Sequence, residues 1–131
     1  MVSPGQACPV RASPQEIAEA TVTAFRRTIP VAVPGIVFLS GGHSEIDATK
    51  YLNAMNQVEG HKPWKLSFSF GRALQASALK AWSGNPDNVK AAQDAFLQRA
   101  KSNCLASLGK YQDEESSQAA GESLFVANHS Y

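Results

Sequence analysis

The sequence predicts an α/β fold, in which helices alternate with parallel strands. Two segments are predicted strands, 35–39 and 64–70, and a helix is expected between them from Glu45 to Met55. A helical crossover returns the chain to the end of the sheet where it started, so the two strands should be parallel neighbours. Two parallel strands are too few for a sheet covered on both faces, and their open edges invite aggregation. The chain therefore has the layout of the end of an α/β fold whose beginning is missing.

The first helix should follow a loop over residues 1–12 and begin at Ser13. Ser13 and Glu16 have the spacing of a capping box, and Pro14 occupies the first helical position, where its missing N–H costs nothing. Pro30 should end the helix, because proline lacks the donor that would continue it. The buried face is expected to contain four residues at helical spacing, namely Ile17, Thr21, Ala24 and Phe25.

The clearest chemical signal lies between the first strand and the next helix. Four consecutive apolar residues, 36–39, favour a strand that is buried on both faces. Ser40, Gly41 and Gly42 follow as a turn without bulky side chains, and Ser44 can cap the helix. The free N–H groups and the dipole of that helix would form an anion site, for which phosphate is the usual ligand. The same pattern is also common as a tight connection without a function.

Periodicity predicts the remaining elements. The helix after the turn should bury a stripe made of Ala48, Tyr51, Leu52 and Met55. In the second strand Trp, Leu and Phe alternate with Lys and Ser, so one of its faces should be buried. Residues 73–82 are alanine-rich and favour a helix. A longer helix is expected over 85–108, with a buried face made of Val89, Ala92, Phe96, Ala100, Cys104 and Leu108.

The composition divides the chain into a folded portion, residues 1–109, and a flexible C-terminal tail, residues 110–131. The tail is rich in Ser, Gln, Glu and Ala, a composition typical of mobile segments. Residues 124–126 form an apolar cluster within it. Either this cluster docks on the folded portion, or it is residual hydrophobicity in a disordered end.

Composition and charge argue against several classes of function. The 131 residues carry 12 basic and 11 acidic side chains, and this net charge of +1 gives no reason to expect nucleic acid or a membrane as a partner. No apolar run approaches the roughly 18 to 20 residues that cross a bilayer. Cys8 and Cys104 are far apart, which favours a reduced, intracellular protein. His43, His61 and His129 have no partners at zinc-ligand spacing, so no metal site is expected.

Both predicted strands end in a serine close to glycine. Ser40, Gly41 and Gly42 follow the first strand, and the second ends with Ser69, Gly71 and Arg72. In a (β/α)8 barrel, sites lie at the carboxyl ends of the strands, and phosphate commonly binds after the last two. A guanidinium suits phosphate because it donates two parallel hydrogen bonds. We therefore interpret the chain as part of such a barrel with a phosphate site. Alternatively, Arg72 is a solvent-facing helix residue.

At these residues the sequence resembles the class I fructose-1,6-bisphosphate aldolases. The matching motifs cover essentially the whole chain and are MVSPG at 1–5, ATVTA at 20–24, FLSGG at 38–42, KPW at 62–64, FSFGRALQASALKAW at 68–82, ESLFVANH at 122–129 and the final Tyr131. The resemblance implies a partial (β/α)8 TIM barrel, namely the last two βα units, the C-terminal helices and the mobile tail. It also implies a homotetramer for the full-length protein and a cytoplasmic location, with a plastid as the alternative.

The resemblance further implies a reaction, the reversible cleavage of fructose 1,6-bisphosphate to dihydroxyacetone phosphate and glyceraldehyde 3-phosphate in glycolysis and gluconeogenesis. The family uses no metal or other cofactor. A lysine amine forms a Schiff base with the ketose, and its protonated nitrogen is the electron sink for cleavage. By match to the family motifs, the sugar phosphate would be bound by Ser40, Gly41, Gly42, Ser69, Gly71 and Arg72. Tyr131 would enter the site and assist proton transfer.

Two features depart from the family pattern. Phe70 stands where the family often has tyrosine, which removes one hydroxyl. The Schiff-base lysine of the family lies just before the motif at residues 1–5, and no lysine of this sequence matches its position. We therefore expect this chain alone to be inactive. The alternative is a truncated, non-catalytic form that binds a sugar phosphate or a protein partner.

Overall fold

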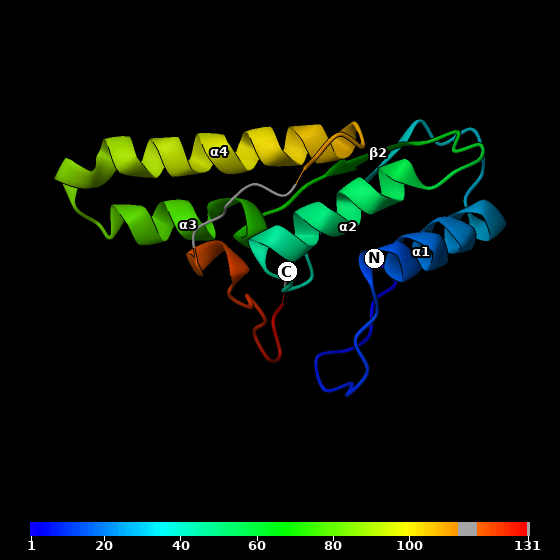
Figure 1. The fold of residues 1–131 in the computed structure, drawn as a ribbon, viewed down its shortest axis with the longest axis horizontal. Coiled ribbons are helices and arrows are strands. Elements are labelled where there is room, and N and C mark those ends of the chain that lie inside the picture. Colours follow the sequence, from blue (N-terminus) through cyan, green and yellow to red (C-terminus); the bar gives the residue numbers. More distant parts are fainter. Residues whose placement is uncertain (113–117, 131) are drawn as a thin grey trace.

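The computed structural model describes residues 1–112 and 118–130 (Figure 1). Its α-helices are α1 (Pro14–Thr28), α2 (Glu45–Gln57), α3 (Arg72–Trp82) and α4 (Val89–Ser107), and its strands are β1 (Gly35–Phe38) and β2 (Lys65–Phe68). Short 3₁₀ turns occupy Pro86–Asn88 and Gln118–Gly121. Figure 1 shows α3 and α4 side by side as an antiparallel hairpin, with α1 beside α2. The order of helices and strands is the one that the sequence predicts.

Strands β1 and β2 form a parallel two-stranded sheet, as expected for strands joined through a helix. Gly35 pairs with Lys65, and the register runs without a bulge to Phe38 opposite Phe68. The Ser69 N–H continues the ladder by donating to the Phe38 carbonyl at 2.8 Å. The carboxyl ends of both strands therefore lie side by side at one edge of the sheet.

The core lies on one face of this sheet. Phe38, Leu66 and Phe70 point to that face and pack with Leu52 and Met55 of α2. The alternation predicted for the second strand is confirmed. Burial of the first strand on both faces is wrong for this chain, because Val37 is 61% exposed and Leu39 is 52% exposed.

The exposed face of β1 has a simple cause. Among the described residues, the apolar groups that pack against the sheet gather on the face that holds Phe38. A run of four apolar residues signals two covered faces only when the rest of the sheet and its second layer are present. Residues 1–112 and 118–130 supply two strands and one covered face.

Helix α1 begins as the sequence predicts. The Ser13 backbone N–H donates to the Glu16 carboxylate at 2.7 Å, and the Glu16 N–H donates to the Ser13 hydroxyl at 3.2 Å, which completes the capping box. The buried face is rotated slightly from the expected one, since Ala18 and Val22 are buried. Ala24 and Phe25, which were expected there, are half-buried.

The buried face expected for the last helix is wrong. Four residues of that face are exposed, namely Val89, Phe96, Cys104 and Leu108. The residues of α4 that are buried instead are Arg99, Ser102, Asn103 and Ala106. Polar pairing explains the rotation, because Arg99 and Asn103 both bind Thr49 of α2. A buried polar group is tolerated when it is hydrogen-bonded, so periodicity of apolar residues alone selects the wrong face here.

The C-terminal segment docks on the folded portion where the structure describes it. Ala120 is 3% exposed, and the Leu124 side chain packs against the core. Figure 1 shows this orange and red segment beside the N-terminal ends of α2 and α3. Of the apolar cluster at residues 124–126, Leu124 docks on the folded portion, whereas Phe125 and Val126 are exposed. The boundary after residue 109 and the mobility of residues 110–131 stay predictions.

We find no helix among residues 1–112 and 118–130 with the length and hydrophobicity of a membrane span.

Candidate functional site

The turn after β1 has the conformation that its glycines permit. Gly41 and Gly42 both have positive φ, at +63° and +86°, a conformation that residues other than glycine rarely adopt. The His43 N–H closes the turn on the Ser40 carbonyl at 3.2 Å. Ser44 then caps α2, its hydroxyl accepting from the Asp47 N–H at 3.0 Å. The predicted capped helix start beside a glycine turn is therefore confirmed.

The second strand end presents an uncapped helix start. Ser69 and Gly71 are exposed, and Gly71 precedes the first residue of α3, Arg72. No side chain of the described residues caps this helix. The Gly71 carbonyl accepts the first helical hydrogen bonds, from Leu74 and Gln75. The N-terminal dipole of α3 thus faces the same edge of the sheet as the glycine turn.

A single residue of the C-terminal segment joins the two strand ends. The Leu124 N–H donates to the Gly42 carbonyl at 3.0 Å. The Leu124 carbonyl accepts from Nη1 of Arg72 at 2.6 Å. Gly42 and Arg72 are 30 positions apart in the sequence, and their bonds to one peptide residue place them at one location. The guanidinium is therefore not a solvent-facing group, which was the alternative interpretation of Arg72.

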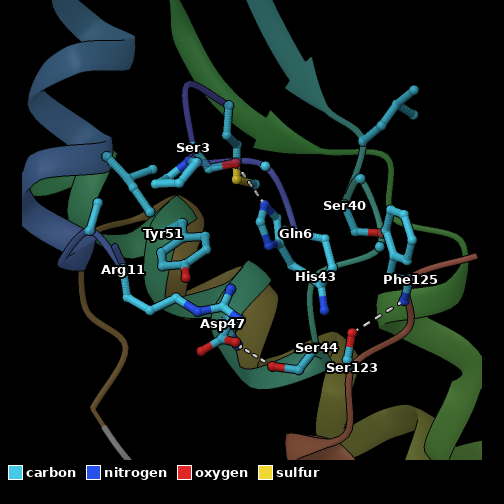
Figure 2. Close-up of a pocket in the computed structure, with 18 of the residues that line it drawn as sticks. Ser3, Gln6, Arg11, Ser40, His43, Ser44, Asp47, Tyr51, Ser123 and Phe125 are labelled. Carbon is cyan, nitrogen blue, oxygen red and sulfur yellow. Dashed lines mark hydrogen bonds between the residues drawn. The ribbon is translucent and has the colours of Figure 1, made fainter. Parts of the chain in front are cut away.

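A cavity of about 550 Å³ lies beside the glycine turn (Figure 2). Its lining includes Ser40, Gly41 and Gly42 together with Ser3, Arg11, His43, Asp47, Tyr51 and Phe125. The other three residues predicted to bind phosphate do not line it, namely Ser69, Gly71 and Arg72. The predicted site is thus divided by residues 124–125, with the glycine turn on the cavity side.

The polar cluster in this cavity was missed by sequence reasoning. His43 Nε2 lies 3.1 Å from the Ser3 hydroxyl, and the His43 ring meets the Tyr51 ring edge-on at a centroid distance of 5.1 Å (Figure 2). The spacing of His43, Asp47 and Tyr51 was the available signal, because residues four apart share a helix face. The sequence predicts Tyr51 in the core, and the structure has it half-buried and packed against the core while it also lines the cavity.

Burial sets the ionisation of this cluster. Burial lowers the pKa of the His43 imidazole below its usual 6.5, and the negative charge of Asp47 opposes this only in part. Burial also raises the pKa of the Tyr51 hydroxyl above 10.0, and Asp47 adds to that rise. At neutral pH the cavity therefore holds a neutral imidazole and a neutral phenol.

Two further expectations concern the site. Tyr131, the predicted proton-transfer residue, lies outside the described residues. Among residues 1–112 and 118–130, no three His, Cys, Asp or Glu side chains gather closely enough to hold a metal ion.

Replacing Gly42 by alanine should release the C-terminal segment from the turn. A Cβ at Gly42 would lie 2.9 Å from the Phe125 Cα. The backbone would have to move to relieve this contact. We expect Gly42→Ala to speed hydrogen exchange of the Leu124 amide by about fivefold, since one backbone hydrogen bond is worth about 1 kcal/mol. Gly41→Ala is the matched control, because Gly41 has a similar positive φ and open space around its Cα. Equal exchange rates in the two variants would contradict the clash.

Stability should fall as the solution is acidified, in part through His43. Because its pKa is lower in the folded chain, the unfolded chain binds more protons, and the free energy of unfolding falls as pH drops below about 6.5. We expect His43→Gln to reduce the difference between urea midpoints measured at about pH 7.5 and about pH 5.5. His61→Gln, at an exposed loop position, should keep the full difference. A His43→Gln protein with an unchanged difference between the two urea midpoints would contradict the contribution assigned to His43.

Comparisons with known proteins agree over the whole chain. The family model Glycolytic, described as fructose-bisphosphate aldolase class-I, matches residues 1–131. Fructose-bisphosphate aldolase of Echinococcus multilocularis and fructose-bisphosphate aldolase 2 of Caenorhabditis elegans are each 62% identical over 131 residues, which are 100% of this chain and 36% of either relative. Fructose-bisphosphate aldolase C of Gallus gallus is 59% identical over 132 residues, covering 100% of this chain and 96% of that sequence.

A solved structure is similar as well. The Plasmodium falciparum fructose-bisphosphate aldolase, solved in complex with TRAP and a small-molecule inhibitor, matches with a TM-score of 0.83 and 48% identity. The match covers 87% of this chain and 33% of that one, so the chain spans about a third of these longer relatives. With the family model matched from end to end, the chain belongs to the class I fructose-bisphosphate aldolase family.

Proposed function

We propose that this chain forms the phosphate-binding corner of a class I fructose-bisphosphate aldolase, which cleaves fructose 1,6-bisphosphate reversibly through a Schiff base. In this proposal the two βα units are the last two of a (β/α)8 barrel. The exposed side of β1, with Val37 and Leu39, would then face the barrel interior. Homotetrameric assembly and a cytoplasmic location belong to the same proposal and rest on family membership.

One observation carries the proposal. The Gly42 turn and the Arg72 guanidinium meet at Leu124, at the carboxyl edge of a parallel sheet. That edge is where ligands bind in folds with parallel strands. Two helix N-termini, those of α2 and α3, begin at the same edge, and both favour a negative charge. A phosphate there would accept hydrogen bonds from backbone N–H groups of the Ser40–Gly42 turn and of Gly71, and from the charged Arg72 guanidinium.

Each predicted residue would have a separate task. The positive φ values of Gly41 and Gly42 turn the backbone N–H groups without a Cβ that would block the ligand. Ser40 and Ser69 would add hydroxyl donors, and Gly71 a backbone donor at the start of α3. Tyr131 would move a proton at the enamine carbon after cleavage. Phe70 is 5% exposed and packs in the core, without the hydroxyl that the family often has at this position.

Arg72 changes partner when phosphate binds, in this account. Its present partner, the Leu124 carbonyl, is neutral, whereas a phosphate oxygen is charged. A guanidinium and a phosphate carry opposite charges and can form two parallel N–H···O bonds, which a single neutral carbonyl cannot match. Phosphate should therefore displace or share the Leu124 contact.

Removing the guanidinium should weaken phosphate binding. We expect inorganic phosphate to shift the NMR signals of the Gly41 and Gly42 amides and of the Arg72 Nε–H group in the 131-residue chain. Arg72→Ala should raise the phosphate Kd about tenfold or more, because a hydrogen bond to a charged group is worth about 1.5–3 kcal/mol. Lys80→Ala, which removes an exposed cation from the other end of α3, should change it less than about twofold. Equal Kd values for the two variants would refute the assignment of Arg72.

The 131-residue chain should not form a Schiff base. We expect no mass increase when it is treated with dihydroxyacetone phosphate and sodium borohydride, because none of its lysines matches the family's nucleophile. An adduct on any lysine would show that this chain contains a competent amine. A full-length class I aldolase treated in parallel is the positive control.

A further inference from the structure

Glu45 is a buried acid that the proposed reaction does not use. It is the first residue of α2 and is only 1% exposed. A carboxylate held away from water loses hydration that only hydrogen bonds and nearby positive charge can replace. The partners of Glu45 therefore indicate what the buried acid does.

Those partners lie on two other helices. The Glu45 carboxylate accepts hydrogen bonds from the backbone N–H of Ser77, at 3.1 Å, and from the Ser77 hydroxyl. Ser77 lies in the second turn of α3, the helix that begins with Arg72. Glu45 therefore joins the first turn of α2 to α3, the helix that begins with Arg72 beside the end of β2.

Helix α4 also contacts Glu45, at its backbone carbonyl. Arg99 is 5% exposed, and its Nη2 donates to the Glu45 carbonyl at 2.7 Å. The Thr49 hydroxyl, one turn along α2, donates to the same carbonyl at 2.8 Å. Arg99 therefore binds the backbone of Glu45, while Ser77 binds its side chain, so Glu45 has hydrogen-bonded partners at both.

The starts of α2 and α3 need a contact that fixes their relative position. Both helices that face the proposed phosphate follow glycines, and α3 has no side-chain cap among the described residues. The sheet fixes the strands only as far as the Ser69–Phe38 hydrogen bond. Among the described residues, the side-chain hydrogen bonds that join the start of α2 directly to α3 are those between Glu45 and Ser77.

We propose that Glu45 is a positioning residue for the phosphate corner, holding α3 so that Arg72 faces the Gly42 turn. It acts through Ser77 and touches no substrate. This inference rests on the proposed function, since it names the residue that sets the geometry of that site. The chemical class of ligand it serves is a phosphate monoester or inorganic phosphate.

Variants of both partners test this role. Glu45→Gln keeps an oxygen that can accept from the Ser77 N–H and places an amide beside the Ser77 hydroxyl. Glu45→Ala removes both bonds, and Ser77→Ala removes one with little change in volume. The matched control is Asn56→Ala. Asn56 also ties α2 to α4 and β2, through the Ala106 and Leu66 carbonyls, but near the other end of α2.

The first readout is the relative orientation of α2 and α3 without ligand, from residual dipolar couplings of the 131-residue chain. Glu45→Ala and Ser77→Ala should change this orientation. Glu45→Gln and Asn56→Ala should keep it, although Asn56→Ala loses stability. If Glu45→Ala does not fold, the comparison of Ser77→Ala with Asn56→Ala decides. An unchanged orientation in Ser77→Ala and in any folded Glu45→Ala protein would overturn the inference.

The second readout is the Kd for inorganic phosphate, followed at the Arg72 Nε–H group. We expect Glu45→Ala to raise it at least fivefold, Ser77→Ala to raise it by a smaller factor, and Glu45→Gln and Asn56→Ala to stay within twofold of the parent chain. Parent-like binding by Glu45→Ala would overturn the positioning role. Absence of phosphate binding by the parent chain would instead contradict the proposed function, and the dipolar couplings would still decide whether Glu45 orients α3.

Discussion

Parallel pairing of β1 and β2 is the constraint on which the rest of the structure depends. Because the ladder runs in register from Gly35 opposite Lys65 to Phe38 opposite Phe68, both strands end at the same edge. In an antiparallel pair the Gly42 turn and Arg72 would stand at opposite edges. The helical crossover through α2 imposes the parallel arrangement, and the apolar residues of α2 that pack under the sheet keep it there.

Much of this arrangement could be predicted from local sequence, because its causes are local. A capping box, a glycine turn and an alternating strand each depend on residues within a few positions of one another. Ser13, Gly42 and Leu66 accordingly behave as expected. The location of Arg72 beside the glycine turn depends on the pairing of two strands, and fold knowledge was needed to predict it.

The failed predictions have non-local causes. Helix α4 turns its apolar residues outward because Arg99 and Asn103 find polar partners on α2, some 50 positions earlier in the chain. No periodicity in α4 alone reveals those partners. Burial of β1 on both faces failed for a related reason, because the apolar run of a strand records how many layers surround it in the whole fold. In the cluster at His43, the contact with Ser3 spans 40 positions and has no local signal, unlike the regular spacing of His43, Asp47 and Tyr51.

The position of Leu124 shows how one backbone residue can occupy a site of this kind. The backbone of one residue offers one donor and one acceptor, and here the Leu124 N–H donates to the Gly42 carbonyl while the Leu124 carbonyl accepts from the Arg72 guanidinium. The charged oxygens of a phosphate could accept from Arg72 but could not donate to the Gly42 carbonyl. The two ends of the Leu124 contact therefore respond differently to phosphate. Phosphate can replace the Leu124 carbonyl as the partner of Arg72, but its charged oxygens do not compete for the Gly42 carbonyl. The C-terminal segment can therefore stay docked at the turn while the arginine binds a ligand.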